Sequence, residues 1–376
     1  MSDIRPDRVW RWLWAWTGLW TLIQAKGAGG SWHYFAQGSR LLFADDGGEG
    51  LHLYAAHPEL QIGPLTFLMA RPFQLLGPME GRVIAVVLMS LTGPPLLAVL
   101  WRLVPVPARS PHRLLAAGLL FLPVWGILGT HAGHLDDVLA LACGVAAMYA
   151  LNSGNAIATG LLIAAAADCK PWALAFAPLL LALPRRDWWR AALVAAAALM
   201  AAWLPFLLYD PSTLNASRFT IPTAVSSGLH VLGFTDPQTP SWDRPAQLLL
   251  GCLLGTIAVV RGRWPAVILL ATSARILLDP EVYGYYTSGV LLGAVAFELI
   301  VARYRVPWLT MTGALALHGV RLLGNVVPIP LEVMGWLRVG YVALVVAVVL
   351  LPGVRLPETT TSPGGLGEFA QQPAGH

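Results

Sequence analysis

The densest group of reactive side chains in the sequence lies between positions 131 and 137, in the order His131-Ala-Gly-His134-Leu-Asp136-Asp137. Two carboxylates beside two imidazoles could bind a divalent cation or orient a sugar. Helix capping is the simpler interpretation, because a carboxylate at a helix N-terminus is stabilised by the helix dipole. Capping accounts for one Asp but not for the whole group. We therefore predict substrate binding by His134, Asp136 and Asp137, and the spacing alone defines no metal motif.

A second group contains His52, His57, Glu59 and Gln61. An imidazole or a carboxylate there could act as general base on an acceptor hydroxyl. The alternative is a solvated loop whose polar residues only cap and turn. The sequence also places His33 in the aromatic run Trp32-His33-Tyr34-Phe35. We take Glu59, His57 and His33 as the candidate catalytic residues.

Two cations lie where apolar stretches end. Lys170 separates two apolar runs, which is costly unless the side chain snorkels to the interface or pairs with an acid. It could bind a phosphate or pair with its neighbour Asp168. Arg275 lies near the end of another stretch and could hold a phosphate in a bidentate fork. Tyr285 could stack on a sugar, although tyrosines also mark membrane interfaces.

The composition indicates which elements position these side chains. The chain has 376 residues, of which 56% are hydrophobic and only 12% charged, whereas soluble domains carry about 25% charged residues. Much of the surface must therefore face lipid. Spanning a bilayer takes about 20 apolar residues. We count twelve candidate stretches: 10–26, 82–102, 113–129, 137–152, 155–169, 171–184, 190–209, 245–261, 264–279, 283–302, 307–323 and 336–353.

The fold class that follows is an all-α, polytopic membrane helical bundle with about twelve spans, forming a single domain over 1–353. The stretch 62–78 contains Pro64, Arg71 and Pro72, so we expect it to lie flat on the outer surface. With that choice every basic cluster falls in the cytoplasm, as the positive-inside rule requires. Both chain ends are then cytoplasmic, and the candidate site residues lie on the outer face.

Two outer connections are long, 27–81 and 210–244, and long loops in compact proteins are usually functional or disordered. The first has an amphipathic pattern suited to a helix in the membrane interface. The segment 354–376 is rich in Pro, Gly, Thr and Gln, which predicts a disordered cytoplasmic tail. Cys143, Cys169 and Cys252 show no metal-ligand spacing, and no basic patch interleaved with aromatics indicates nucleic-acid binding.

Several segments carry a resemblance to a known family. They are Ser31-Trp-His-Tyr-Phe35 leading into Gly38-Ser-Arg-Leu-Leu42, then Tyr54, Gly63-Pro64-Leu65, and the run from Gly154 to Lys170-Pro171 that continues to Arg185-Arg186. With the first span and the long outer loop, this pattern resembles the GT-C superfamily of membrane glycosyltransferases. It is most similar to the actinobacterial family 87 polyprenyl-phosphate-mannose-dependent mannosyltransferases. The resemblance covers roughly residues 10–300.

The resemblance implies a bacterial plasma-membrane enzyme that moves a sugar, with mannose expected, from a polyprenyl-phosphate donor to an envelope glycolipid or glycan. In that family an acid of the first outer loop is the base, and basic residues hold the donor phosphate. The acid would fall at Ser31, which has no carboxylate, whereas Lys170 falls near the donor phosphate. Either His33, His57 or Glu59 replaces the acid, or the protein has lost or changed this activity.

Two other classes of function stay open. A lipid or solute transporter would place its polar groups near mid-membrane, whereas this sequence gathers them toward one surface. A catalytically inactive scaffold in envelope assembly would agree with the missing acid at Ser31. A primary ATP-driven pump is disfavoured, because the sequence contains no nucleotide-binding loop.

Overall fold

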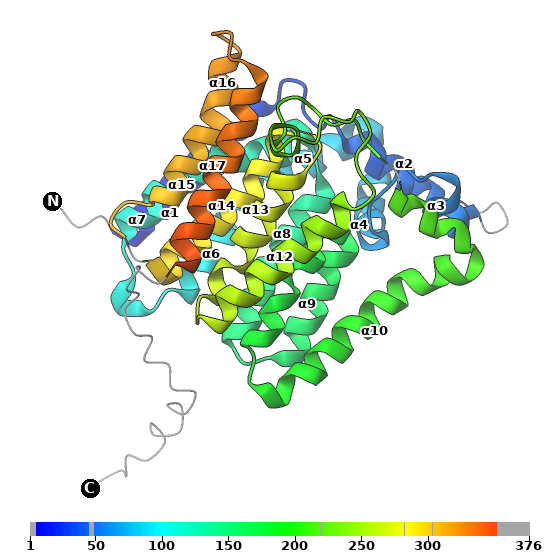
Figure 1. The fold of residues 1–376 in the computed structure, drawn as a ribbon, viewed down its shortest axis with the longest axis horizontal. Coiled ribbons are helices and arrows are strands. Elements are labelled where there is room, and N and C mark those ends of the chain that lie inside the picture. The colour runs from blue at the N-terminus through cyan, green and yellow to red at the C-terminus, as the bar shows by residue number, and fades with distance from the viewer. Residues whose placement is uncertain (1–4, 45–48, 219, 282, 303, 352–376) are drawn as a thin grey trace, which may run out of the picture.

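The computed structural model describes residues 5–44, 49–218, 220–281, 283–302 and 304–351 (Figure 1). Within these residues every regular element is a helix, apart from one isolated antiparallel bridge between Pro222 and Gln238. The all-α class expected from the sequence is confirmed. The tail expected at 354–376 lies outside the described residues.

The α-helices form a bundle whose members follow one another with short connections (Figure 1). In chain order they are α1 (Pro6–Gln24), α2 (Trp32–Leu42), α3 (Leu53–Ala56), α4 (Pro64–Gln74), α5 (Pro78–Leu91), α6 (Gly93–Leu103), α7 (Pro111–Gly126), α8 (Leu135–Asn152), α9 (Ala156–Cys169), α10 (Arg185–Tyr209), α11 (Gly228–Val231), α12 (Asp243–Val260), α13 (Val267–Leu278), α14 (Thr287–Phe297), α15 (Trp308–Gly313), α16 (Val320–Gly324) and α17 (Leu331–Leu350).

Shorter or differently wound helices connect and extend these. The 3₁₀ segments are η1 (Glu49–His52), η2 (Val106–Ala108), η4 (Pro171–Ala182), η5 (Pro211–Arg218), η6 (Trp264–Ala266) and η7 (Gly284–Tyr286). The π-helical segments are η3 (Ile127–Ala132), η8 (Glu298–Ala302) and η9 (Ala314–Gly319). Each π segment directly continues an α-helix, as π-bulges usually do.

Seven helices of the described part are long and apolar enough to cross a membrane, which supports a helical membrane protein. They are Pro78–Leu103, Pro111–Ala132, Leu135–Asn152, Arg185–Tyr209, Asp243–Val260, Gly284–Ala302 and Leu331–Leu350. The prediction of twelve spans is not confirmed. The other five predicted stretches are helical too, but each is short, broken or charged.

The reasons differ among these five stretches. The first helix, α1, carries Asp7, Arg8 and Arg11 within its first two turns. The elements α9, η4 and α13 have 14, 12 and 12 residues, whereas a perpendicular span takes about 20. The stretch 307–323 is divided among α15, η9 and α16. Charge at the start of α1, and short or divided helices in the other four stretches, therefore separate the predicted count from the seven helices found.

The stretch 62–78 becomes α4, a helix of 11 residues. At a rise of 1.5 Å per residue it is about 16 Å long, too short for a hydrocarbon core of about 30 Å. This agrees with the expectation that the stretch does not span. The amphipathic segment before it forms α2, which buries Trp32 and Phe35 and packs on α4.

Prolines and polar caps start many of these helices. Pro occupies the first turn of α1, α4, α5, α7 and η4, where its missing N–H leaves no helical bond unmade. The side chains of Ser110 and Asn155 accept hydrogen bonds from the third residue of α7 and α9. The side chain of Glu298 accepts bonds from the backbone of Leu309 and Thr310 at the start of α15.

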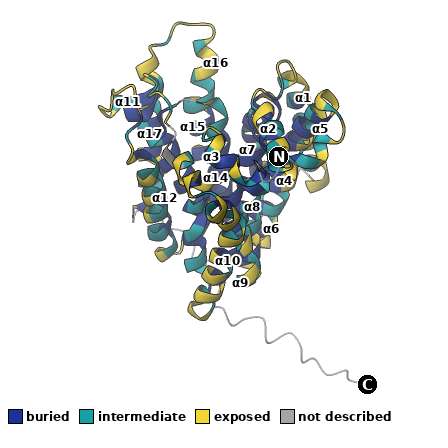
Figure 2. Cartoon of the chain, turned by 90° about the vertical axis from the view of Figure 1, so that its right-hand side faces the viewer, coloured by how far each residue is buried: buried dark blue, intermediate teal, exposed yellow. Residues whose placement is uncertain are grey.

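Burial divides the bundle into a centre and a periphery (Figure 2). In the candidate span Gly284–Ala302, which contains α14, 83% of an apolar 18-residue stretch is buried. In α10 the corresponding share is 17%. The outward side chains of α10 include the exposed Leu193, Met200 and Leu208. An exposed apolar helix of this length is expected to contact lipid. The central α14 meets α13 and α7, which carry or border the polar residues described below.

Candidate functional site

A left-handed turn at Gly133 sets up the start of α8. Gly133 ends η3 with a φ of 65°, and a Cβ there would also meet Gly29 Cα at 2.7 Å. Only glycine combines this backbone conformation with so close an approach. The chain then turns, so that His134 precedes α8 and Asp136 and Asp137 fill its first turn.

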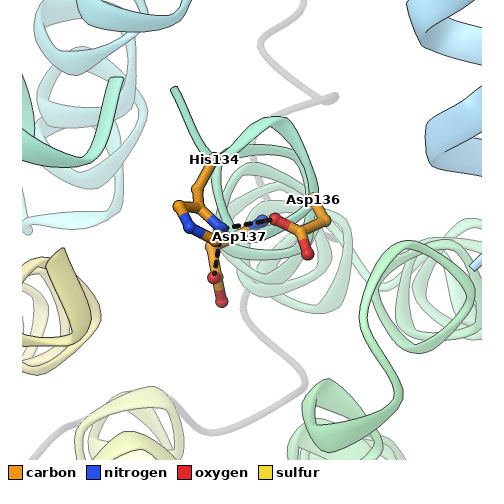
Figure 3. Close-up of side chains that lie close together, drawn as sticks. All are labelled: His134, Asp136 and Asp137. Atoms are coloured by element: carbon orange, nitrogen blue, oxygen red, sulfur yellow. Dashed lines mark hydrogen bonds and ion pairs between the residues drawn. The ribbon is translucent and has the colours of Figure 1, made fainter. Parts of the chain in front are cut away.

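His134 lies between the two carboxylates (Figure 3). Its Nδ1 is 3.3 Å from Asp136 Oδ1 and 3.7 Å from Asp137 Oδ2. Asp136 is 0% exposed, and the backbone N–H of Asp137 donates to its Oδ1 over 2.8 Å. That last bond lies within the first turn of α8, whose N-cap residue His134 makes no side-chain capping bond. It occupies only one of the four carboxylate oxygens.

Lys170 arrives at this point from the end of α9. It has an extended backbone, φ −146° and ψ 115°, because the ring of the following Pro171 disfavours the helical conformation. Its ammonium forms an ion pair with Asp136 Oδ2, across 34 positions of the sequence. The neighbouring Asp168 instead accepts from the backbone N–H of Leu65. The local Lys170–Asp168 pair that the sequence left open is therefore not the one formed.

Arg275, in the last turn of α13, is the cation of the second carboxylate. Its Nη1 donates to Asp137 Oδ1 over 2.7 Å, and Trp172 Nε1 donates to the same oxygen over 3.0 Å. The guanidinium lies 4.5 Å from the Trp172 ring centroid and 3.8 Å from that of Tyr286. Cation–π contacts of this kind hold a guanidinium in one orientation. We call His134, Asp136, Asp137, Lys170 and Arg275 the charge cluster.

A stack of aromatic rings borders the charge cluster. The rings of His134 and Tyr285 are stacked with centroids 3.8 Å apart, and Tyr283 stacks on the other side of Tyr285 at 5.4 Å. These tyrosines come from the turn before α14. Tyr283 lies outside the spanning helices, and burial raises the pKa of its phenol. The stack makes the predicted Tyr285 a direct neighbour of the predicted His134.

The charge cluster is built from helix ends rather than helix centres. It takes His134 and the two Asp from the start of α8, Lys170 from the end of α9, and Arg275 from the end of α13. Beside it lies a cavity of about 10 Å³, lined by Asp137, Trp172, Arg275 and Tyr286 among others. That volume is about what one water molecule needs. All six residues predicted to bind substrate are thus brought together at one end of the bundle.

The charge cluster favours internal ion pairs over a divalent cation. The ligand atoms of His134, Asp136 and Asp137 lie within 4.8 Å of one another, so their types and spacing would suit a metal. However, Asp136 already has the ammonium of Lys170, and Asp137 has the guanidinium of Arg275. A dication would add positive charge beside two cations that already neutralise both acids. The divalent cation that the sequence allowed therefore does not fit these residues as they are paired.

One oxygen of the charge cluster is without a hydrogen bond. Asp137 Oδ2 is buried and has no hydrogen-bond partner among the described residues, with only His134 Nδ1 nearby at 3.7 Å. A buried carboxylate oxygen in that state carries a desolvation cost of order 1–3 kcal/mol. It is also the oxygen of the cluster that is left to accept a proton or a hydrogen bond from a bound molecule.

The predicted catalytic residues lie apart from these contacts. His57 Nδ1 and Glu59 Oε1 are 3.3 Å apart, with side chains 34% and 40% exposed. Among the described residues, these two side chains make their polar contact with each other. Gln61 ties the segment to η5 by donating to Ala216 O, and Gly63 N donates to Cys169 O. Glu59 is thus four residues from a backbone contact beside Lys170, within about 14 Å along the chain.

The third predicted catalytic residue, His33, is exposed on α2. Its Nδ1 lies 3.0 Å from Gly30 O and its ring 3.9 Å from that of Tyr34. His52, which the sequence groups with His57 and Glu59, contacts Asp210 Oδ2 at 2.8 Å. Hydrogen bonds from Ser212, and then from His52, lower the pKa of Asp210. This second pair joins η1 to the end of α10, and its role is therefore explained by the packing of these two elements.

The family resemblance expects an acid at Ser31, and the backbone of Ser31 lies close to the charge cluster in the folded protein. Its backbone N–H donates to Ala132 O over 2.8 Å, two residues before His134. Ser31 is also the residue before α2, although its side chain makes no capping bond. The expected position of the acid and the acids present therefore belong to one region.

Trp172 and Tyr286 complete the site but were not among the predicted residues. Both hold Arg275, and Trp172 also donates to Asp137. Aromatic residues at the ends of apolar stretches normally indicate an interface belt, so their residue types did not mark these two as site residues. The one signal was position: Trp172 follows Lys170 by two residues, and Tyr286 follows Tyr285.

No family model matches the chain, and the comparisons with curated proteins and with solved structures found no match either.

Proposed function

We propose that this chain is a membrane glycosyltransferase that moves a sugar, mannose in the first instance, from a polyprenyl-phosphate donor to an envelope glycolipid or glycan. The observation that carries the proposal is the charge cluster. It joins two buried carboxylates, two cations and a stacked aromatic ring at one end of an apolar helical bundle. A lipid-linked sugar needs acids for its hydroxyls, cations for its phosphate and an apolar wall for its chain.

The reaction has two charge changes that these groups would serve. The acceptor oxygen attacks the anomeric carbon with inversion, while the bond from that carbon to the phosphate oxygen breaks. The acceptor hydroxyl loses its proton to a carboxylate, and the departing lipid phosphate gains negative charge. Lys170 and Arg275 would stabilise that charge, which is where much of the rate would arise. The stacked Tyr285 would lie against the sugar ring.

Two sets of residues compete for the role of base. Asp137 has the buried oxygen without a hydrogen bond and lies within the charge cluster. Glu59, with His57, is half-exposed and can be approached by a large acceptor. We favour Asp137, because a general base must lie within hydrogen-bond reach of the proton that it takes. His33, His57 and Glu59 stay as the predicted replacements for the acid that the family resemblance expects at Ser31.

The proposal requires the site to open. A cavity of about 10 Å³ beside Asp137 admits a water molecule but not a sugar. The elements that close it are Trp172 and the turn that carries Tyr285 and Tyr286, which is joined to α14. We expect this turn to move when the donor binds, as closing loops do in many enzymes. The site would face outward in the bacterial plasma membrane, with both chain ends in the cytoplasm and about twelve transmembrane helices.

The decisive experiment measures transfer by purified protein in liposomes that contain envelope lipids, with a panel of radiolabelled polyprenyl-phosphate sugars. The wild type is compared with Asp137→Asn, Glu59→Gln and the control Asp7→Asn, which makes the same chemical change on exposed α1. We expect the wild type to label an acceptor in a donor-dependent way. The rate of transfer should fall by about 10²–10⁴-fold in the variant that lacks the general base. Asp7→Asn should equal the wild type.

Each result has a definite meaning. Loss in Asp137→Asn alone supports the assignment of Asp137, whereas loss in Glu59→Gln alone moves the base to Glu59 and leaves the transferase proposal standing. No transfer from any donor, by protein that is folded and binds lipid, overturns the proposal. Movement of labelled lipid or solute across the liposome membrane without transfer would then indicate a transporter.

A further inference from the structure

A groove of about 450 Å³ opens between α2 and the connection from α4 to α5, outside the charge cluster. Its floor includes the backbone of Gly29 and Gly30, and its walls include Trp32 and Phe73. These two aromatic rings pack edge to face with centroids 5.7 Å apart. The walls are therefore a fixed part of the fold.

The polar side chains of the groove are basic or neutral. Arg40, Arg82, His33 and Gln74 line it, and none of the described residues that line it carries a carboxylate. Two guanidinium groups line one hollow that has no carboxylate among its lining residues, which makes it attractive to an anion. The acid nearby is the exposed Glu80, whose Oε2 lies beside the lining residue Gly77. Arginine suits a phosphate best, because its planar fork can donate two hydrogen bonds to one phosphate group.

Arg82 is held in place by the backbone opposite. Its guanidinium donates to Ala28 O. Its Nε would lie 2.8 Å from a Cβ on Gly29, a residue with a φ of 70°. Glycine at this position lets Arg82 lie against the chain at the edge of the groove. Arg40, in the last turn of α2, is exposed and supplies the second cation.

Exposed apolar side chains adjoin the groove. Leu75 and Leu76 follow the lining residue Gln74, Met79 follows the lining residue Pro78, and Val83 follows the lining residue Arg82. They are 76%, 50%, 64% and 50% exposed. Exposed apolar side chains beside a basic hollow, at the start of the candidate span Pro78–Leu103, match a bilayer at the level of its head groups.

We propose that this groove binds the phosphate-bearing head group of an anionic lipid. Arg40 and Arg82 hold the phosphate, and the acyl chains lie along Leu75, Leu76, Met79 and Val83. A soluble phosphate compound would satisfy the two arginines but would leave the apolar surface bare. The charge complementarity and the apolar surface together therefore select a lipid. The binding itself does not depend on sugar transfer.

The groove also lies next to the charge cluster. Gly29 N and Gly30 N donate to Thr130 O and His131 O, over 2.8 and 3.1 Å. From α2, which lines the groove, the Phe35 ring meets the His134 ring edge to face at 6.0 Å. If the proposed transferase activity holds, a lipid bound here is placed to be the acceptor; this last step rests on that proposal.

The test is lipid binding by the full-length, detergent-purified protein, with no sugar donor present, followed by native mass spectrometry. Dioctanoyl phosphatidylglycerol is the anionic lipid, and dioctanoyl phosphatidylcholine and inorganic phosphate are the comparisons. We expect at least tenfold preference for phosphatidylglycerol over phosphatidylcholine, and no displacement by millimolar phosphate. Arg40→Gln/Arg82→Gln should weaken the binding of phosphatidylglycerol by about tenfold for each arginine.

Two further variants separate a specific site from general attraction. Ala36→Trp places a ring in the groove without changing the charge, and should also abolish the preference. The control Arg185→Gln/Arg186→Gln removes the same charge from the exposed start of α10 and should bind as the wild type does. A thermal transition measured by circular dichroism confirms folding of each variant. If the double Arg variant does not fold, binding of phosphatidylglycerol by Ala36→Trp decides whether the groove is the lipid site.

Equal binding of the two lipids overturns the proposal, as does unchanged binding in both groove variants. Displacement of the lipid by inorganic phosphate would reassign the groove to a free anion and also overturn it. Because no donor is used, these outcomes are independent of whether the chain transfers a sugar.

Discussion

The carboxylates of the charge cluster can be buried because each has its own cation. Asp136 is fully buried against Lys170, His134 and the backbone N–H of Asp137, and Asp137 is buried against Arg275 and Trp172. Burying a charge costs several kcal/mol unless it is paired and hydrogen-bonded. At the scale of single residues, the site therefore consists of coupled pairs, and removing one member should be worse than removing both.

This coupling predicts a non-additive pattern of stability. Asp136→Leu or Lys170→Met alone leaves one buried charge uncompensated, and should lower the free energy of unfolding by about 3–5 kcal/mol. The Lys170 side chain is only 18% exposed, so water screens this pair weakly. Asp136→Leu/Lys170→Met together should recover most of that loss. Unfolding in detergent micelles by increasing denaturant measures all three; simple addition of the two single losses would contradict the coupling.

At the scale of elements, glycines let the helices that carry the site approach closely. In α14 a Cβ at Gly293 would lie 2.4 Å from both N and Cα of Leu269 in α13. Small residues at helix crossings are how membrane helices reach van der Waals contact. This crossing joins α13, whose last turn carries Arg275, to α14, which begins after Tyr285 and Tyr286.

Gly293→Ala should therefore push α13 from α14 and destabilise the protein by about 1–3 kcal/mol, as overpacking does. The matched control is Gly340→Ala in the interior of α17, where a Cβ meets nothing within 4 Å. It should stabilise the helix by about 0.5–1 kcal/mol, because alanine loses less backbone entropy than glycine. Thermal unfolding in detergent compares the two; equal shifts of the same sign would rule out a tight α13–α14 crossing.

At the scale of the whole molecule, exposed apolar helices surround a buried centre, so lipid is the natural surrounding (Figure 2). The orientation in that lipid is a prediction from the positive-inside rule, which places Asp210 and the charge cluster outside. The connection from α8 to α9 should then lie inside. Ser212 and Ser153 are exposed residues of these two connections, which the prediction places on opposite sides of the membrane.

Single-cysteine variants test this orientation. With Cys143, Cys169 and Cys252 replaced, Ser212→Cys should react with a membrane-impermeant maleimide in intact cells, because its side chain faces the outer medium. Ser153→Cys should react only after the membrane is permeabilised. The reverse pattern would place the charge cluster in the cytoplasm and would contradict transfer from a donor on the outer face.

The sequence by itself determined the class of the fold and the residue types of the site. Apolar composition and proline positions are local properties, so they indicated helices in a membrane and also the non-spanning nature of 62–78, which becomes the short α4. For the same reason the unusual density of His and Asp at 131–137 could be singled out as a candidate site. His134, Asp136, Asp137, Lys170, Arg275 and Tyr285 were all chosen in this way, and the structure brings them together.

Only the tertiary structure decided which of these residues meet. Lys170 pairs with Asp136 and not with the adjacent Asp168, and Arg275 pairs with Asp137 across 138 positions of sequence. The tertiary structure also divides 307–323 into short helices and gives the Glu59 side chain His57 as its partner. Hydropathy and spacing describe each segment alone, whereas an ion pair depends on how helix ends dock. That docking is set by close crossings such as Gly293 on Leu269, which no single segment contains.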